Sequence, residues 1–480
     1  MQFKIHIMKE GTGMTHTPRS YDPRSFEQLT YHDRLPAFGD GSDTPRAYLE
    51  RCLEVIAERE PVVQAFAALN EKAAREAADA SAERWKAGKP LSLIDGMPIG
   101  VKDLLETRDM PTQMGCEAYR GNFPKRDNAM VSALRQAGAV ILGKTVTAEL
   151  GGSHPRPTTN PFDPACTPGG SSSGTGAAVG ARMIPCGVGT QVGGSIIRPA
   201  SYCGNVALKP TQGALNRGER QGTSQSTHGF QAGSVEDMWR ASIAVARRAG
   251  GDRGDFALSG PDTAPAARQP ARLIVLETEG WAVTDDVTRS AFAELLDRIA
   301  ATGVTLLTRR DCPPVDVLEQ SIADGGEISN AITAWENRWA HRNLVDQSPD
   351  GVSARLKEAL ASAEAMTPDD YHALLARRAA AQAIHAQVGP MADGAILLSA
   401  PGPAPLWPGD RPGEPLAPRP TGTPACNFGT SMLFAPATTV PMMGVGGLPV
   451  GVQIMGCPRE DAATTAVARW LLESVSPVVV

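Results

Sequence analysis

Residues 168–211 read PGGSSSGTGAAVGARMIPCGVGTQVGGSIIRPASYCGNVALKPT and contain two segments rich in glycine and serine. A short run between them, AAVGARM at residues 177–183, has the composition of a helix. Long irregular stretches inside a compact domain usually line a site, because loops on a rigid scaffold carry functional groups. This part of the chain is therefore predicted to contain the functional centre.

The segments on either side alternate between helical and extended patterns, which indicates an α/β fold. Apolar residues at helical spacing predict helices at 46–88, 127–137 and 458–475. Extended runs predict strands at 139–142, 272–277 and 448–456. Residues 91–105 are apolar and punctuated by glycine, so we expect a short strand, a turn and a second strand that carries Lys102.

The length of 480 residues allows one large α/β domain or two domains of ordinary size. Residues 1–45 are polar and aperiodic, which predicts an N-terminal arm, and residues 1–13 are expected to be a dispensable extension ahead of Met14. The remaining residues, 46–480, are predicted to form one domain. Within it, 270–415 is rich in Ala, Glu and Arg, which indicates a helical region that ends in a proline-rich loop.

Composition excludes several classes of protein. The formal charge of −6 argues against a nucleic-acid partner, which needs a basic face. No run approaches the roughly 18 consecutive apolar residues of a membrane span, so no membrane partner is expected. Eight cysteines without a CxxC pair indicate packed, reduced thiols in a cytoplasmic protein. No histidine or cysteine spacing suits a metal.

Three short motifs match known patterns but lack the required context. Residues 138–145, GAVILGKT, match a phosphate-binding loop, yet a helix precedes them and their centre is an apolar strand. Residues 170–174, GSSSG, match a nucleophile elbow, but prolines and turn formers stand where a strand must lead in. Residues 174–180 resemble a dinucleotide fingerprint without a preceding strand and with the last glycine displaced. All three are expected to be structural.

A serine nucleophile without an evident histidine needs another base, and Lys102 is the candidate. Its neighbours in MPIGVKDLL are apolar, and burial lowers the pKa of a lysine because desolvation disfavours the ammonium form. A serine from the cluster at 171–173 can relay the proton, since a hydroxyl both donates and accepts. The two glycines before Ser195 expose successive backbone N–H groups, as an oxyanion hole requires.

These residues and their order resemble the amidase signature family of serine hydrolases. The resemblance runs from about residue 46 to the end and is weak between about 270 and 415. Besides residues 168–211, the motifs that carry it are GMPIGVKD at 96–103, GAVILGKTVTAE at 138–149, TTNPFDP at 158–164 and GLPVGVQIMG at 447–456. The resemblance implies an α/β/α sandwich around a large mixed β-sheet, with a helical elaboration over the site.

The resemblance also implies a Ser–cis-Ser–Lys triad. Ser195 is then the nucleophile, Ser171 the bridging serine that follows a cis peptide bond, and Lys102 the general base. The oxyanion would be held by the backbone amides of Val192, Gly193, Gly194 and Ser195. Ser172 and Gln191 are predicted to support the site, Ser172 through the Lys102 network. No cofactor is implied.

Three departures from the common family pattern stand close to these residues. Ser173 replaces a glycine of GGSSGG, and Gln191 replaces the aspartate of TDTGGS. Glutamine keeps the capacity to form hydrogen bonds but has no charge, so the electrostatics around Lys102 should differ. Arg198 stands one position later than in the related GSIRIP form, and we expect it to bond loop carbonyls.

The resemblance implies that the protein is an amidohydrolase. We expect it to cleave the C–N bond of a small or aryl amide or carbamate through an acyl-enzyme on Ser195. Two alternatives within the family are a glutamine-dependent amidotransferase subunit that supplies ammonia to a partner, and an esterase. A non-catalytic interaction protein is a third interpretation, which the intact set of Lys102, Ser171 and Ser195 disfavours. The expected partner is a small-molecule substrate, and a homodimer stays open.

Overall fold

The computed structural model describes residues 20–152, 154–218, 222–407, 409 and 415–480. Met14 and the extension expected before it lie outside these residues. Within this part of the chain, twelve strands form one sheet. Their order is β1-β3-β2-β4-β6-β5-β10-β11-β9-β7-β8, and β12 pairs with β10.

The strands take up short segments spread over the whole described chain. Their bounds are β1 (Phe66–Leu69), β2 (Pro98–Lys102), β3 (Val140–Thr145), β4 (Cys186–Gln191), β5 (Val206–Lys209), β6 (Thr227–Ala232), β7 (Arg272–Val275), β8 (Thr305–Leu307), β9 (Ala395–Leu398), β10 (Ala437–Val445), β11 (Leu448–Met455) and β12 (Val478–Val479). Strand β2 runs parallel to both of its neighbours, β3 and β4. Strand β7 is parallel to β8 and β9, whereas β4, β6, β5, β10, β11 and β9 pair in antiparallel fashion. The sheet is therefore mixed, as predicted.

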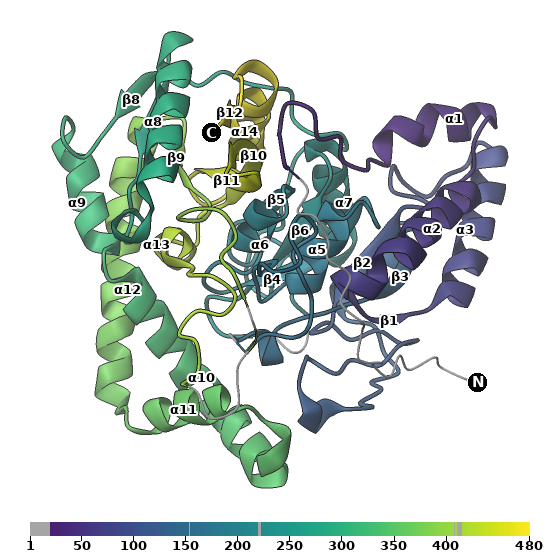
Figure 1. Ribbon diagram of the computed structural model, residues 1–480, viewed down its shortest axis with the longest axis horizontal. Helices are drawn as coiled ribbons and strands as arrows, with labels where there is room; N and C mark the ends of the chain where they lie inside the picture. The colour runs from purple at the N-terminus through teal and green to yellow at the C-terminus, as the bar shows by residue number, and fades with distance from the viewer. Residues whose placement is uncertain (1–19, 153, 219–221, 408, 410–414) are drawn as a thin grey trace.

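Helices surround this sheet (Figure 1). Their bounds are α1 (Leu35–Asp40), α2 (Pro45–Val63), α3 (Glu71–Lys86), α4 (Ala129–Gln136), α5 (Ser173–Gly180), α6 (Ile197–Tyr202), α7 (Val235–Ala249), α8 (Asp286–Ala301), α9 (Pro313–Ile322), α10 (Gly325–Gln347), α11 (Ala354–Glu364), α12 (Pro368–Val388), α13 (Ala425–Met432) and α14 (Asp461–Ser474). Helices α10, α11 and α12 form a lobe at the lower left of Figure 1, away from α2 and α3 on the right.

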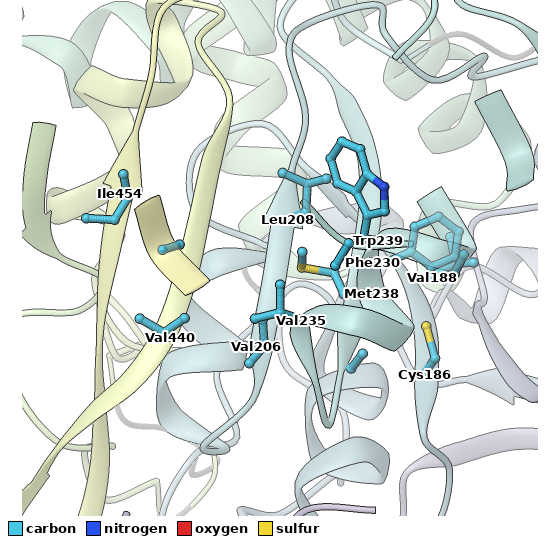
Figure 2. Packing of buried hydrophobic residues seen from close by; sticks show 14 of the residues in the cluster. Cys186, Val188, Val206, Leu208, Phe230, Val235, Met238, Trp239, Val440 and Ile454 are labelled. Carbon is cyan, nitrogen blue, oxygen red and sulfur yellow. The ribbon is translucent and has the colours of Figure 1, made fainter. Parts of the chain in front are cut away.

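Alternate residues of a strand point to opposite faces, and here they enter different hydrophobic clusters. In β3, Ile141 joins the cluster under α4, α7, α8 and α14, whereas Val140 and Leu142 join the one under α2, α3 and α5. The first cluster includes Trp239 of α7, which packs with Phe230 and Leu208 (Figure 2). Both faces of the sheet are thus covered, and the predicted α/β/α sandwich is confirmed.

Local sequence signals explain where several helices begin and end. Thr44 accepts a hydrogen bond from the Ala47 amide at the start of α2, and Asn128 accepts one from the Met130 amide at the start of α4. Gly138 follows α4 with a φ of +88°, a conformation that favours glycine. The first glycine of the phosphate-loop pattern therefore ends a helix.

The structure differs from the sequence predictions in several places. Strand β1 interrupts the helix expected over 46–88, and residues 91–97 form turns without a strand. Part of the expected N-terminal arm is helical, in α1, and its Phe38 is buried against Tyr31. In the region 270–415, β7 confirms the strand expected at 272–277, whereas β8 and β9 join the sheet where only helices and a proline-rich loop were expected. Short strands were missed because their length gives little periodic signal.

Candidate active site

Lys102 is the last residue of β2 and is fully buried. Its Nζ lies 2.8 Å from Ser171 Oγ and 2.8 Å from Thr190 Oγ1. The carbonyl oxygen of Thr190 is further away, at 3.4 Å. No carboxylate among the described residues forms an ion pair with this amine. The structure thus brings together Lys102 and Ser171, which lie 69 residues apart.

The surroundings of Lys102 favour its neutral form. Burial lowers its pKa well below the usual 10.5, because the ammonium form loses its hydration, and the positive charge of Arg198 lowers the pKa further. A neutral amine has a free electron pair and can accept a proton from a hydroxyl. The site can therefore supply a base at a lower pH than an exposed lysine would require.

Ser171 is held in place through the backbone on both of its sides. The peptide bond between Gly170 and Ser171 is cis, as the resemblance implied. Arg198 donates from Nη2 to the carbonyl oxygen of Gly170 at 2.6 Å, and the amide of Ala148 donates to the carbonyl of Ser171 at 3.0 Å. Arg198 also donates from Nε to the carbonyl of Thr421, so it bonds loop carbonyls as predicted.

Thr190 is a site residue that the sequence did not reveal. Its side chain contacts Lys102 Nζ, and its backbone is fixed by Ser172, whose Oγ lies 3.3 Å from both the amide nitrogen and the carbonyl oxygen of Thr190. Ser172 thus reaches Lys102 indirectly, through Thr190. A threonine at the end of a glycine-rich strand carries no signal of this contact, because the contact depends on how β2 and β4 pair.

Ser195 follows β4 in the turn formed by residues 192–195, just before α6. The backbone N–H groups of Val192, Gly193, Gly194 and Ser195 have no hydrogen-bond acceptor anywhere in the described chain. The half-buried hydroxyl of Ser195 likewise bonds to none of the described residues, Ser171 included. This turn presents unpaired donors beside an unpaired hydroxyl.

The two glycines of this turn are required by close packing of α13. A side chain at Gly193 would place its Cβ 2.6 Å from the ring of Phe428, and one at Gly194 would lie 2.4 Å from Oδ1 of Asn427. Sequence reasoning did not connect α13 with the site. The only available signal was the pair of glycines itself, which says that something lies close but not what.

Gln191 keeps the hydrogen-bonding role that a carboxylate could fill and adds a donor. Its Oε1 accepts from the amides of Ile196 at 2.8 Å and Ile197 at 3.0 Å, at the start of α6. Its Nε2 donates to Oγ of Ser431 in α13 at 3.0 Å. The glutamine thus donates a hydrogen bond to Ser431 that an ionised aspartate could not donate.

The three other motifs are structural here, as expected. In the phosphate-loop pattern, residues 140–145 form β3, and Lys144 pairs with Asp103. A loop with no strand leads into residues 170–174, which removes the elbow geometry, and residues 174–180 lie within α5.

Other predicted properties concern thiols, metals and membranes. All eight cysteines are unbridged. Among the described residues, no cluster of His, Cys, Asp or Glu could hold a metal ion, and none of their helices has the length and apolar character to span a bilayer.

Comparison with known proteins gives one family. The family model described as Amidase matches residues 47–464, which include the turn at 192–195 and the loop that carries Ser171. A glutamyl-tRNA(Gln) amidotransferase subunit from Chloroflexus aurantiacus is 30% identical over 463 residues, which cover 90% of this chain and 94% of that one. The same-named subunit from Chloroflexus aggregans is 40% identical over 195 residues, 39% of this chain and 40% of that one.

The fold is shared with solved structures of similar size. A crystal structure described as an amidase superposes with a TM-score of 0.80 at 26% identity, covering 93% of this chain and all of that one. The likeness in three dimensions therefore extends over nearly the whole chain, including most of the weakly recognisable region at 270–415.

Proposed function

The chain belongs to the amidase signature family, and from that premise we propose that it is an amidohydrolase. Its reaction would cleave the C–N bond of a small or aryl amide or carbamate through an acyl-enzyme on Ser195. The observation that carries this proposal is the environment of Lys102. A buried amine without a carboxylate partner among the described residues lies 2.8 Å from Ser171 Oγ and 2.8 Å from Oγ1 of Thr190, and a turn of unpaired backbone donors begins two residues after Thr190.

In the proposed acylation step, neutral Lys102 accepts the proton of Ser171, and Ser171 accepts the proton of Ser195. The oxygen of Ser195 then forms a bond to the substrate carbonyl carbon. The carbonyl oxygen becomes an oxyanion that the amides of the 192–195 turn stabilise, because they face a developing charge without having to reorganise. This step requires the Ser171 and Ser195 hydroxyls to form a hydrogen bond when substrate binds.

Collapse of the tetrahedral intermediate breaks the C–N bond. The leaving nitrogen takes the proton that Lys102 holds, delivered through Ser171, and departs as a neutral amine. A water molecule then attacks the acyl-enzyme while the same two groups accept its proton, and the carboxylic acid and free Ser195 result. Every proton that is taken up is returned, so the proposed cycle balances with these side chains and water alone.

The test uses a fluorophosphonate probe, which modifies activated serines, followed by mapping of the adduct by peptide mass spectrometry. We expect the adduct on Ser195 and its loss in Ser195→Ala and Lys102→Met. A matched control is Ser173→Ala, which removes a buried hydroxyl at the start of α5, two residues after Ser171, and should leave labelling intact. An adduct on Ser172, or undiminished labelling in Lys102→Met, would contradict the proposed triad.

A second candidate function has its own support, since the relatives reported above are named as amidotransferase subunits. In that case the chain would release ammonia from glutamine for a partner. The departure at Gln191 weighs against it. The isolated chain should be assayed with glutamine and with an acetanilide: aniline release without a partner supports the hydrolase, whereas ammonia release that depends on a partner supports the second candidate.

Several finer properties are proposed together with the hydrolase. We place the enzyme in the cytoplasm, acting on a small-molecule substrate, with residues 46–480 as the catalytic domain and residues 270–415 over the acyl pocket. An esterase activity would use the same acyl-enzyme, and comparing ester with amide turnover would measure it. Sedimentation would test for a homodimer.

A further inference from the structure

The carbonyl groups of the 192–195 turn are held by side chains from distant parts of the chain. Oγ of Ser431, in α13, donates to the carbonyl oxygen of Gly193 at 2.7 Å. Nε2 of Gln225, in the loop before β6, donates to the carbonyl oxygen of Val192 at 3.0 Å. Both side chains are almost completely buried. We infer that Ser431 and Gln225 are positioning residues for the oxyanion hole, an inference that rests on the proposed function.

Peptide geometry links these carbonyls to the donors of the turn. In a planar trans peptide, the C=O of one residue and the N–H of the next point in opposite directions. Holding the carbonyl of Val192 therefore fixes the N–H of Gly193, and holding the carbonyl of Gly193 fixes the N–H of Gly194. A third bond, from the Arg198 amide to the carbonyl of Gly194 at 2.9 Å, fixes the N–H of Ser195 in the same way.

Glycine makes this external support necessary. Gly193 and Gly194 lack Cβ atoms, so their backbone dihedral angles are less restricted than those of any other residue. Without the two side-chain donors, both peptide planes could rotate and turn their N–H groups away from the oxyanion. Preorganised donors stabilise a transition state because their orientation does not have to be established during the reaction.

Gln191 determines which way the Ser431 hydroxyl donates. The Nε2 group of Gln191 occupies an acceptor site on Ser431 Oγ at 3.0 Å, which leaves the single hydroxyl proton for Gly193. A carboxylate at position 191 could only accept, and it would compete with Gly193 for that proton. The glutamine that departs from the family pattern at 191 thus has its hydrogen-bond acceptor in Ser431, 240 residues away.

Gln225 connects the turn to the helical lobe. Its side-chain amide has two N–H groups, of which one reaches Val192 and the other reaches Oγ of Ser329 in α10 at 2.9 Å. The hydroxyl of Ser329 is buried as well. Packing of α10 against this loop therefore bears on the orientation of the Gly193 amide.

The experiment compares Ser431→Ala with Ser431→Thr, which restores a hydroxyl. The readouts are kcat and KM for an anilide, and the inhibition constant of an aryl trifluoromethyl ketone, which forms a tetrahedral adduct on serine. Removing an oxyanion donor outright costs roughly 100- to 1,000-fold in kcat, so loss of its orientation should cost on the order of tenfold. We expect Ser431→Ala to lower kcat and to raise the inhibition constant of the ketone in parallel, with KM unchanged. Ser431→Thr should recover both kcat and the inhibition constant.

Thr430→Val is the matched control, because Thr430 is the buried neighbour of Ser431 and, among the described residues, its hydroxyl bonds only the carbonyl of Asn427 within α13. It should leave kcat and ketone inhibition unchanged. Gln225→Met keeps the length of the side chain but removes both donors, and it should reproduce the Ser431→Ala pattern independently. Thermal unfolding shows that each variant is folded at the assay temperature.

The outcomes separate the inference from the proposed function. If the wild type neither hydrolyses anilides nor labels at Ser195, the proposed function fails and this inference fails with it. If the wild type is active but Ser431→Ala and Gln225→Met retain its kcat and its ketone inhibition, only the positioning role is overturned. A rise in KM alone would also overturn it, because it would indicate lost substrate contacts.

Discussion

Two buried lysines on neighbouring strands differ in what surrounds them. Lys102 ends β2 and Lys144 lies in β3, the two strands are parallel, and both side chains are fully buried. Nζ of Lys144 lies 2.8 Å from Oδ1 of Asp103 and 2.7 Å from Oγ1 of Thr112. Among the described residues, the polar partners of Lys102 Nζ are hydroxyl and carbonyl groups.

The difference teaches that burial alone does not make a lysine a base. Burial lowers the pKa of both amines, but at Lys144 the carboxylate of Asp103 opposes that shift, whereas at Lys102 the charge of Arg198 adds to it. The carboxylate beside Lys144 thus favours the charged form of that amine, whereas the surroundings of Lys102 favour the neutral form, which can accept a proton. The phosphate-loop pattern pointed to Lys144, and its role is structural.

The largest effect expected from this comparison is on catalysis. Lys102→Met should lower kcat by about 10³-fold or more, since it removes the group that holds the transferred proton. Its melting temperature should equal or exceed that of the wild type, because a desolvated amine is replaced by an apolar chain of similar length. Anilide turnover and calorimetry measure both quantities. A clear loss of stability without loss of kcat would reverse the assignment of the two lysines.

Lys144→Met should behave in the opposite way. It leaves the Asp103 carboxylate buried without its counter-charge, which should cost about 3–5 kcal/mol of unfolding free energy. Denaturant unfolding measures this, and kcat of the protein that remains folded should stay near the wild-type value. The double variant with Asp103→Leu should regain much of the stability. If it does not, the pair is not the reason for the loss.

Thr190→Val sharpens the comparison at Lys102, the proposed base. The variant keeps the shape of the side chain but removes the hydroxyl that lies 2.8 Å from Lys102 Nζ. A buried hydrogen bond contributes about 1 kcal/mol, so kcat should fall by up to about tenfold. The matched variant Thr112→Val acts on Lys144 and should change stability instead. Equal effects of both variants on kcat would contradict the distinction.

The smallest effect concerns the pH profile. Because Lys102 must be neutral to act, kcat/KM should rise with pH as Lys102 loses its proton, and the lowered pKa brings that rise to a pH below the usual 10.5. Replacing Arg198 with Met removes a positive charge, which raises the pKa of Lys102 and should move the rise to higher pH. Profiles of kcat/KM against pH for the wild type and for Arg198→Met measure this shift. A shift to lower pH, or none, would exclude Arg198 as a cause.

Much of the candidate site could be predicted because its residues belong to short motifs that can be recognised from neighbouring residues alone. Residue type and spacing were enough to select Lys102, the serine cluster at 171–173 and Ser195, and the resemblance to the amidase signature family singled out Ser171 within that cluster. Thr190, Gln225 and Ser431 belong to no such motif. Their roles arise from contacts between segments up to 240 residues apart, which no local pattern encodes.

The sequence by itself determined the α/β class, the family and the identity of the three candidate catalytic side chains, because these follow from short-range periodicity and from ordered motifs. Only the tertiary structure decided which buried lysine is paired, how Gln191 is used and which side chains hold the turn before Ser195. The physical reason is that charge state and backbone orientation depend on partners that folding brings together. Sequence states which groups exist, and packing decides which of them face one another.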